Sequence, residues 1–176
     1  MFKTELLNDK ECVITGYEGE EKEITIPCSI NGKNVIKIGD HAFFGRDIHK
    51  VIIPNTIKVI GYKAFHECCS LKEITFVEGL QVIGYSAFCG NRCKKIVIPE
   101  GITEIQTYAF CDCPLLEEVY IPNSIQTIEK DAFSMNENLV DVTIPERFKN
   151  QLNEIFKEDN DYKYRRRKQS INYKFI

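Results

Sequence analysis

The chain has 176 residues, of which 43% are hydrophobic and 28% are charged. This ordinary globular composition predicts one folded domain and excludes a chain that is disordered as a whole. Its 23 basic and 26 acidic residues give a net charge of −3, so there is no electrostatic reason to expect nucleic-acid binding. No apolar run approaches the roughly 20 residues that span a bilayer, so membrane insertion is not expected either.

Residues 1–23 precede the repetitive part of the sequence and are expected to form an N-terminal cap of β-structure. They contain no apolar stretch of roughly 7–15 residues, which a secretory signal requires. With Met1 as the native start, the protein is therefore expected to be cytoplasmic.

Three sets of residues recur at a nearly constant spacing through the middle of the chain. Ala-Phe pairs are spaced 22, 23, 22 and 23 residues apart, at Ala42-Phe43, Ala64-Phe65, Ala87-Phe88, Ala109-Phe110 and Ala132-Phe133. An isoleucine precedes each pair, at Ile38, Ile60, Ile83, Ile105 and Ile128. Ile-Pro pairs follow the same spacing, with Phe76-Val77 in place of one of them, at Ile26-Pro27, Ile53-Pro54, Ile98-Pro99, Ile121-Pro122 and Ile144-Pro145.

Each repeat predicts a short strand followed by a tight turn. The residues before each Ile-Pro alternate between apolar and polar, as in a half-buried strand, and proline then ends the strand. The Ala-Phe segment is too short for an independent helix and is expected to be a turn. Because one such unit cannot bury its own apolar face, residues 24–145 are expected to stack as five to six coils that share a core.

The two ends of the repeat array depart from the pattern. The first two Ile-Pro pairs are 27 residues apart, and Asn31-Gly32 in the surplus segment favours a tight hairpin. Residues 146–176 are expected to form a C-terminal cap. Within it, Glu146 to Lys157 has the spacing of an amphipathic helix, and alternating Ile171, Tyr173 and Phe175 predict a final strand over the sheet edge.

The unit L-x-x-V-x-I-P-x-x-I-x-x-I-x-x-x-A-F resembles the BspA-like, or Treponema-type, leucine-rich repeat. The resemblance covers about residues 11 to 176, nearly the whole chain. It implies a right-handed α/β solenoid, mostly β, with a parallel sheet face. It also implies adhesion or protein–protein contact, commonly on a bacterial cell surface or in a secreted protein.

The outward side chains of the predicted sheet are the candidate binding residues. One outward column alternates in charge and includes Lys95 and Glu118, while the next contains the apolar residues Ile52, Val97 and Tyr120. We predict that these five side chains contact a protein partner. The face covers on the order of 400 Å², about half of a standard interface per partner, so weak binding and a monomer or weak homo-oligomer are expected.

Other functional interpretations have less support. One is a structural spacer or self-associating segment of a larger surface protein, and another is a carbohydrate-binding or enzymatic module that uses His66 or Cys69. The sequence contains no phosphate-binding glycine loop and no H-E-x-x-H motif. No catalytic residue, cofactor or metal ligand is therefore predicted. A basic run at 163–168 could contact an anionic surface, although the acidic residues before it offset its charge.

Eight cysteines are expected to be mostly buried, reduced thiols. Cys68 and Cys113 are expected to point inward in one column with Gly45, Gly90 and Asn136. Cys89 and Cys111 share the column that follows the phenylalanines. A disulfide between these two is the alternative in an oxidising compartment, and zinc is disfavoured because paired C-x-x-C spacing is lacking.

Overall fold

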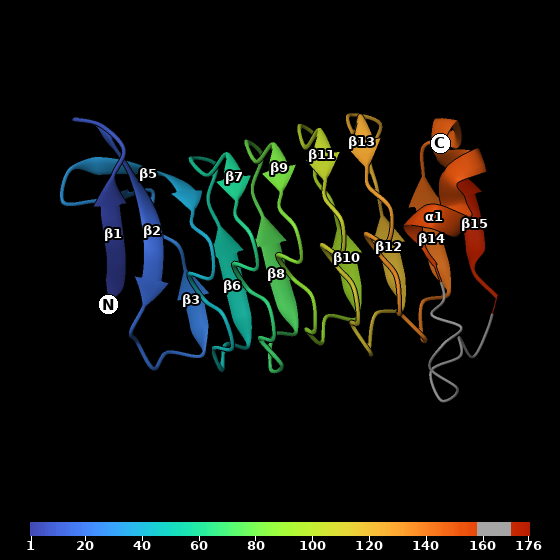
Figure 1. Ribbon diagram of the computed structural model, residues 1–176, viewed down its shortest axis with the longest axis horizontal. Coiled ribbons are helices and arrows are strands. Elements are labelled where there is room, and N and C mark those ends of the chain that lie inside the picture. The colour runs from blue at the N-terminus through green and yellow to red at the C-terminus, as the bar shows by residue number, and fades with distance from the viewer. Residues whose placement is uncertain (158–169) are drawn as a thin grey trace.

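The computed structural model describes residues 1–157 and 170–176. It is a row of stacked coils that runs from the N-terminal cap to the C-terminal cap (Figure 1). The isoleucine that precedes each Ala-Phe pair lies in a parallel ladder of short strands, formed by β5 (Lys33–Ile38), β7 (Val59–Ile60), β9 (Val82–Ile83), β11 (Glu104–Ile105) and β13 (Thr127–Ile128). The sequence reasoning expected only the other sheet face, because two-residue strands leave no alternating pattern to read.

The strands that end at Ile-Pro form that other face, as predicted. It is divided into two sheets along the molecule. The first sheet contains β3 (Glu23–Thr25), β6 (Lys50–Ile53) and β8 (Glu73–Phe76), and the second contains β10 (Lys95–Val97), β12 (Glu118–Tyr120), β14 (Asp141–Ile144) and β15 (Asn172–Phe175). All of these pairs are parallel and in register from coil to coil.

The division lies between β8 and β10, which are not hydrogen-bonded neighbours. This coil carries Phe76 where the others carry the buried isoleucine of an Ile-Pro pair. Phe76 is only partly buried and turns its ring edge toward Phe88, with 5.7 Å between centroids. Ile74 on the same strand is also partly exposed, whereas its counterparts Val51 and Ile96 are buried. The larger ring in an isoleucine position therefore coincides with an opened sheet.

A stack of phenylalanine rings forms the axis of the core. The rings of Phe43, Phe65, Phe88, Phe110 and Phe133 lie 4.7–5.4 Å apart and are all fully buried. This spacing is close to the separation of neighbouring strands in a sheet, about 4.8 Å. The hydrogen-bonded coils therefore place each ring against the next, and the period of 22–23 residues becomes a continuous apolar column.

The N-terminal cap closes one end of this column with an antiparallel strand pair. β1 (Phe2–Leu6) pairs with β2 (Glu11–Tyr17), and β2 continues in parallel with β5. Tyr17 extends the ring column, with its ring tilted against that of Phe43 at 5.6 Å between centroids. The predicted hairpin is confirmed, since β4 (Ser29–Ile30) pairs antiparallel with the start of β5 through left-handed Asn31 and Gly32.

The C-terminal cap is only partly as predicted. Residues expected to form one amphipathic helix form a 3-10 helix, η1 (Glu146–Gln151), followed by a single α-turn, α1 (Leu152–Ile155). Phe156 explains the irregularity, because its ring stacks 5.4 Å from Phe133 and continues the core column. The backbone of this segment therefore takes the place of one more coil, and the Phe133 N–H donates to Ile155 O at 3.0 Å. The final strand is confirmed as β15, which pairs with β14.

Each turn uses two left-handed residues, one on either side of Ala-Phe. The first position holds His41, Lys63, Ser86, Tyr108 and Asp131, and the second holds Gly45, Glu67, Gly90, Asp112 and Met135. Gly45 and Gly90 are therefore turn residues, and their expected place in the inward column is wrong. The third coil instead contributes Asn91 to that column, which is fully buried beside Cys68, Cys113 and Asn136.

Candidate functional site

Four of the five predicted binding residues lie together on two neighbouring strands. β10 and β12 pair in register, so that Val97 lies beside Tyr120 and Lys95 lies beside Glu118. Val97 is 51% exposed and Tyr120 is 37% exposed, which leaves an apolar pair on the outer face of the sheet. The Lys95 Nζ and Glu118 Oε2 atoms form an ion pair at 2.6 Å along one edge of this pair.

Ile52 is separated from the other four predicted residues. It lies on β6, which belongs to the other sheet, and it is only partly exposed. The interruption between β8 and β10 lies between this strand and the remaining four residues. A compact candidate patch therefore contains Lys95, Val97, Glu118 and Tyr120, which we call the β10–β12 patch.

Alternating charges along the strands form ion pairs across the coils, as the sequence pattern predicts. Lys50 Nζ lies 2.6 Å from Glu73 Oε1 in the first sheet, and Lys95 pairs with Glu118 in the second. The two pairs lie on opposite sides of the interruption. Each pair connects adjacent strands within its own sheet and helps to fix their register. Exposed pairs of this kind contribute little to stability.

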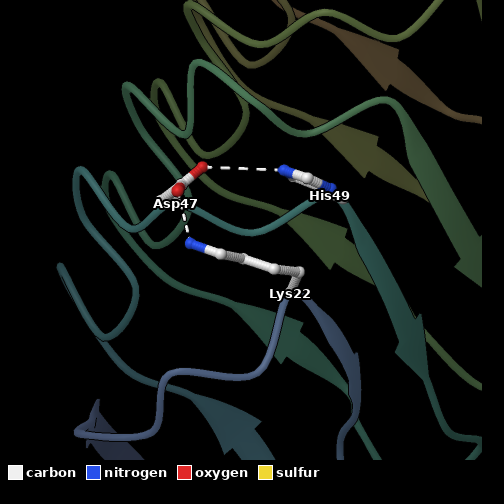
Figure 2. Close-up of polar contacts among 3 residues, drawn as sticks. All are labelled: Lys22, Asp47 and His49. Atoms are coloured by element: carbon white, nitrogen blue, oxygen red, sulfur yellow. Dashed lines mark hydrogen bonds and ion pairs between the residues drawn. The ribbon is translucent and has the colours of Figure 1, made fainter.

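A third column flanks the strands and is basic over the first four coils, at Lys22, His49, Lys72 and Lys94, but it is partly neutralised. Figure 2 shows Lys22 and His49 directed toward the carboxylate of Asp47, with 3.8 Å between His49 Nε2 and Asp47 Oδ1. Hydrogen bonding by Lys22 holds the pKa of Asp47 below its usual value. Further along, Lys94 pairs with Glu117 at 3.3 Å. The column therefore offers few uncompensated charges to an acidic partner.

A cavity of about 340 Å³ adjoins this cluster at the junction of the N-terminal cap and the first coil. It is lined by Tyr17, Gly19, Glu20, Glu21, Lys22, Arg46, Asp47 and Ile48. Tyr17 donates its hydroxyl hydrogen bond to Glu21, and burial together with this bond raises the pKa of Tyr17 to about 12. The lining groups largely satisfy one another, which indicates a structural junction rather than a prepared ligand site.

An aromatic ladder on the turn side, exposed at His41 and Tyr62 and partly buried at Tyr85 and Tyr108, was missed by the sequence reasoning. His41, Tyr62, Tyr85 and Tyr108 lie in contact along the coils, with centroids 5.0, 5.4 and 5.6 Å apart. Phe44 and His66 form a second, shorter stack beside them at 5.4 Å. The sequence does contain a signal for this ladder, because an aromatic residue recurs one or two positions before each of the first four Ala-Phe pairs. It was obscured because these residues are divided between two adjacent columns, with His41 and Tyr108 directly before the alanine and Tyr62 and Tyr85 two residues before it.

The structure separates the cysteines into distinct environments. Cys68, Cys93 and Cys113 are buried, and their thiols donate to the carbonyl oxygens of Phe43, Leu71 and Phe88 at 3.1, 3.7 and 3.5 Å. Burial raises the pKa of Cys68 and Cys93 to about 12. Cys28 and Cys69 are exposed, and all eight cysteines are free thiols. The inward direction predicted for Cys68 and Cys113 is confirmed.

The described residues contain neither a metal-binding cluster nor a membrane-spanning helix. Residues 1–157 and 170–176 contain no cluster of three or more His, Cys, Asp or Glu side chains that could hold a metal ion. No helix in the described part of the chain is long and apolar enough to cross a membrane. The basic run at 163–168 lies outside the residues that the structure describes.

Comparison with known proteins identifies the repeat. The BspA type leucine-rich repeat region matches residues 36–163 in 6 copies. A leucine-rich repeat protein of T. pallidum is 30% identical over 82% of this chain and 69% of its own, with a TM-score of 0.77. A leucine-rich cell surface protein of Faecalibacterium prausnitzii is 26% identical, with a TM-score of 0.64.

The matched proteins are generally longer than this chain. The F. prausnitzii protein is covered over 53% of its length and a leucine-rich repeat protein of Bacteroides ovatus, 27% identical with a TM-score of 0.57, over 46%. These two matches extend over 99% and 82% of the present chain, respectively. No curated protein matches the sequence. From its repeat signature, its stacked coils and these likenesses, the chain belongs to the BspA-type leucine-rich repeat family.

Proposed function

We propose that this chain is a non-enzymatic protein-binding or adhesion module that contacts its partner through the β10–β12 patch. The observation that carries the proposal is the exposed pair Val97 and Tyr120, held in register on a rigid sheet and bordered by the Lys95–Glu118 ion pair. Tyrosine is enriched at interfaces because it combines a large apolar ring with a polar tip. A neighbouring apolar side chain and a charged border complete the composition of a small recognition patch.

The family supports a role outside the cell. Repeats of this family are typical of surface proteins that act through protein contact, and one matched structure is described as a cell surface protein. The patch alone is smaller than a standard interface of about 800 Å² per partner. We therefore expect weak binding by one domain, strengthened where several copies are displayed together on a surface.

The test compares capture of the same partner by three forms of the purified protein. The parent, a Val97→Ser/Tyr120→Ser variant and a Leu6→Ser/Leu7→Ser control are immobilised and exposed to host extracellular extract. The control removes two exposed apolar residues from the N-terminal cap, far from the patch. Each form must first show an unchanged circular dichroism spectrum and melting temperature.

A partner retained by the parent and the control but lost by the patch variant would support the proposal. A partner held equally by all three forms would contradict it and direct attention to the aromatic ladder. Self-association is the second candidate function, because an exposed apolar pair on a sheet face can also meet a second copy. Concentration-dependent sedimentation of the parent that disappears in the patch variant would favour this candidate over a foreign partner.

A further inference from the structure

Two thiols on neighbouring coils, Cys89 and Cys111, contact each other on the turn side of the solenoid. They occupy the same position of successive repeats, directly after Phe88 and Phe110, whose rings stack at 5.4 Å. Backbone hydrogen bonds bracket them, from Phe88 N–H to Ala109 O at 2.8 Å and from Gly90 N–H to Cys111 O at 3.0 Å. The side chains are close enough for the Cys89 thiol to hydrogen-bond to Cys111.

This pairing differs from the arrangement of the buried inward-facing cysteines. Cys68, Cys93 and Cys113 direct their thiols at backbone carbonyls and are almost completely buried. Cys111 instead accepts a hydrogen bond from Ser134 Oγ at 3.4 Å, in addition to the bond from Cys89. Adjacent coils separate the two backbones by about 4.8 Å, inside the range of roughly 4.4–6.8 Å between Cα atoms that a disulfide needs.

The environment assigns different properties to the two sulfurs. Hydrogen bonds donated by Cys89 and Ser134 lower the pKa of Cys111, while the donated bond and burial raise the pKa of Cys89. Cys111 is 2% exposed, whereas Cys89 is partly exposed and forms the accessible member of the pair. The pair therefore contains an accessible sulfur in contact with a buried sulfur that is stabilised as a thiolate.

The position of the pair along the solenoid is as informative as its chemistry. Cys89 belongs to the coil that begins with β8, and Cys111 belongs to the coil that begins with β10. These are the two coils whose strands are not hydrogen-bonded on the other face. On that side Arg92 N–H still reaches Leu71 O at 2.8 Å, close to the start of the strands. A covalent link between Cys89 and Cys111 would join the coils that the interrupted sheet leaves less firmly connected.

We propose that Cys89 and Cys111 form a reversible oxidation site, where exchange with a low-molecular-weight disulfide braces the solenoid across its interrupted sheet. The reaction starts with Cys89 as a thiol and Cys111 as a thiolate. Cys89 passes its proton to the Cys111 thiolate while the Cys89 sulfur attacks the external disulfide RSSR and releases RS⁻, which leaves a Cys89–S–S–R bond. Cys111 then attacks the Cys89 sulfur, gives up its proton and expels the second RS group. In total, the Cys89 thiol and the Cys111 thiolate become one disulfide, and RSSR becomes RSH and RS⁻.

The experiment uses the full chain with the two exposed cysteines replaced, Cys28→Ser and Cys69→Ser, so that unrelated exchange is removed. This protein is incubated with oxidised glutathione and then with excess reduced glutathione. We expect the intact mass to fall by two hydrogen atoms and to recover on reduction. Tandem mass spectrometry should place the link between Cys89 and Cys111, and the oxidised form should melt at a higher temperature.

Three variants in the same background make the assignment specific. Cys89→Ser and Cys111→Ser should each abolish the link, whereas Cys93→Ala, which removes a buried thiol from the segment that leads into β10, should retain it. Circular dichroism of each reduced variant confirms that the fold is intact. A stable glutathione adduct without the internal link, a link through Cys113, or no reaction at all would overturn the proposal.

Bracing has a separate readout in amide hydrogen exchange. The Arg92 amide joins the segments that lead into β8 and β10, beside the interruption, so its exchange should slow several-fold in the oxidised protein. The Gln126 amide, which donates to Thr103 O at 2.8 Å between two later coils, serves as the internal control and should be unchanged. Equal rates for Arg92 in both forms would show that the disulfide does not brace this junction.

Discussion

Single buried polar side chains decide how neighbouring coils connect. Asn136 is the clearest example, because its Nδ2 group donates to Phe133 O at 2.9 Å and to Phe110 O at 3.0 Å. Its Oδ1 atom accepts from the Cys113 N–H at 2.8 Å. One side chain therefore satisfies backbone groups in two coils, in a place where water has no access.

Replacement of this residue should be costly. Asn136→Ala leaves the Cys113 N–H and two carbonyl groups without their partner, and we expect the free energy of unfolding to fall by about 3 kcal/mol. Urea titration followed by circular dichroism measures the change. The exposed Asn123→Ala serves as the control and should stay within about 0.5 kcal/mol. An equal, small change in both variants would show that the buried amide is dispensable.

Tyr17 predicts a dependence of stability on alkaline pH. Its side chain is 5% exposed, and its pKa is about 12 in the folded protein against about 10 in an unfolded chain. Because the folded pKa is the higher one, the contribution to stability is complete below about pH 10 and is lost as the pH rises toward about 12. We expect the parent to lose stability over this window more steeply than Tyr17→Phe, which lacks the titrating hydroxyl.

Denaturant unfolding of both proteins at neutral pH and at several alkaline values checks this expectation. The difference between the two proteins isolates Tyr17, because the cysteines and the remaining tyrosines titrate in both. Parallel curves for the two proteins would contradict the assignment. A tyrosine absorbance titration of the parent provides an independent measure of the raised pKa.

Among the elements, β8 and β10 differ from the other neighbouring strands of the same face. Between β10 and β12, the Glu118 N–H donates to Lys94 O at 3.1 Å. Lys95 holds the same position on β10 as Glu118 does on β12, but it faces the interruption. We expect the Lys95 and Val97 amides to exchange hydrogen faster than the Glu118 and Tyr120 amides.

Nuclear magnetic resonance hydrogen exchange resolves these four amides individually. The comparison is internal, since the strands lie in one sheet and carry similar side chains. Slower exchange in β10 than in β12 would show that the interruption closes in solution. Replacement of Phe76 by the isoleucine of the other coils gives a second test, because a closed ladder should then protect Lys95.

The elements also show how far the sequence determines the fold. The Ala-Phe and Ile-Pro columns predicted the coils, their strands and their shared core, because identical residues on one spacing must occupy identical positions. The second ladder escaped prediction because its strands in the coils are only two residues long. The C-terminal cap was predicted as one regular helix, whereas it is a 3-10 helix followed by one α-turn. Nothing in the local spacing of apolar residues indicates that Phe156 packs in the core column.

The candidate site was predicted less completely than the fold. Alternation identified which side chains point outward, so Val97 and Tyr120 were placed on the correct face. It did not reveal that Ile52 is separated from them, because the effect of Phe76 on the sheet depends on side-chain bulk in three dimensions. The contact between Cys89 and Cys111 follows from their shared column in the sequence. The hydrogen bond that Ser134 donates to Cys111 could be found only in the structure.

At the scale of the whole molecule, each coil contacts only its neighbours. Stability is then close to a sum of coil and interface terms, and damage at one end stays local. Phe156 is 2% exposed and terminates the ring column against Phe133. We expect Phe156→Ala to cost about 3–5 kcal/mol and to act mainly on the last coils.

Hydrogen exchange along the chain measures this localisation. Amides of β12 and β14 should lose protection in the variant, whereas those of β2 and β5 should keep it. Phe44→Ala, which truncates a phenylalanine that is 42% exposed, is the matched control and should have a small effect everywhere. Uniform loss of protection over all strands would instead show that the solenoid unfolds as a single cooperative unit.

The interrupted sheet also has a mechanical consequence. A pull along the solenoid axis loads the hydrogen bonds between coils in sequence, so that coils peel apart one after another at low force. The junction between β8 and β10 carries fewer of these bonds and should yield first, dividing the molecule into two segments that each remain wound. A surface protein built in this way would lengthen under shear while the β10–β12 patch, which lies wholly within one segment, kept its shape.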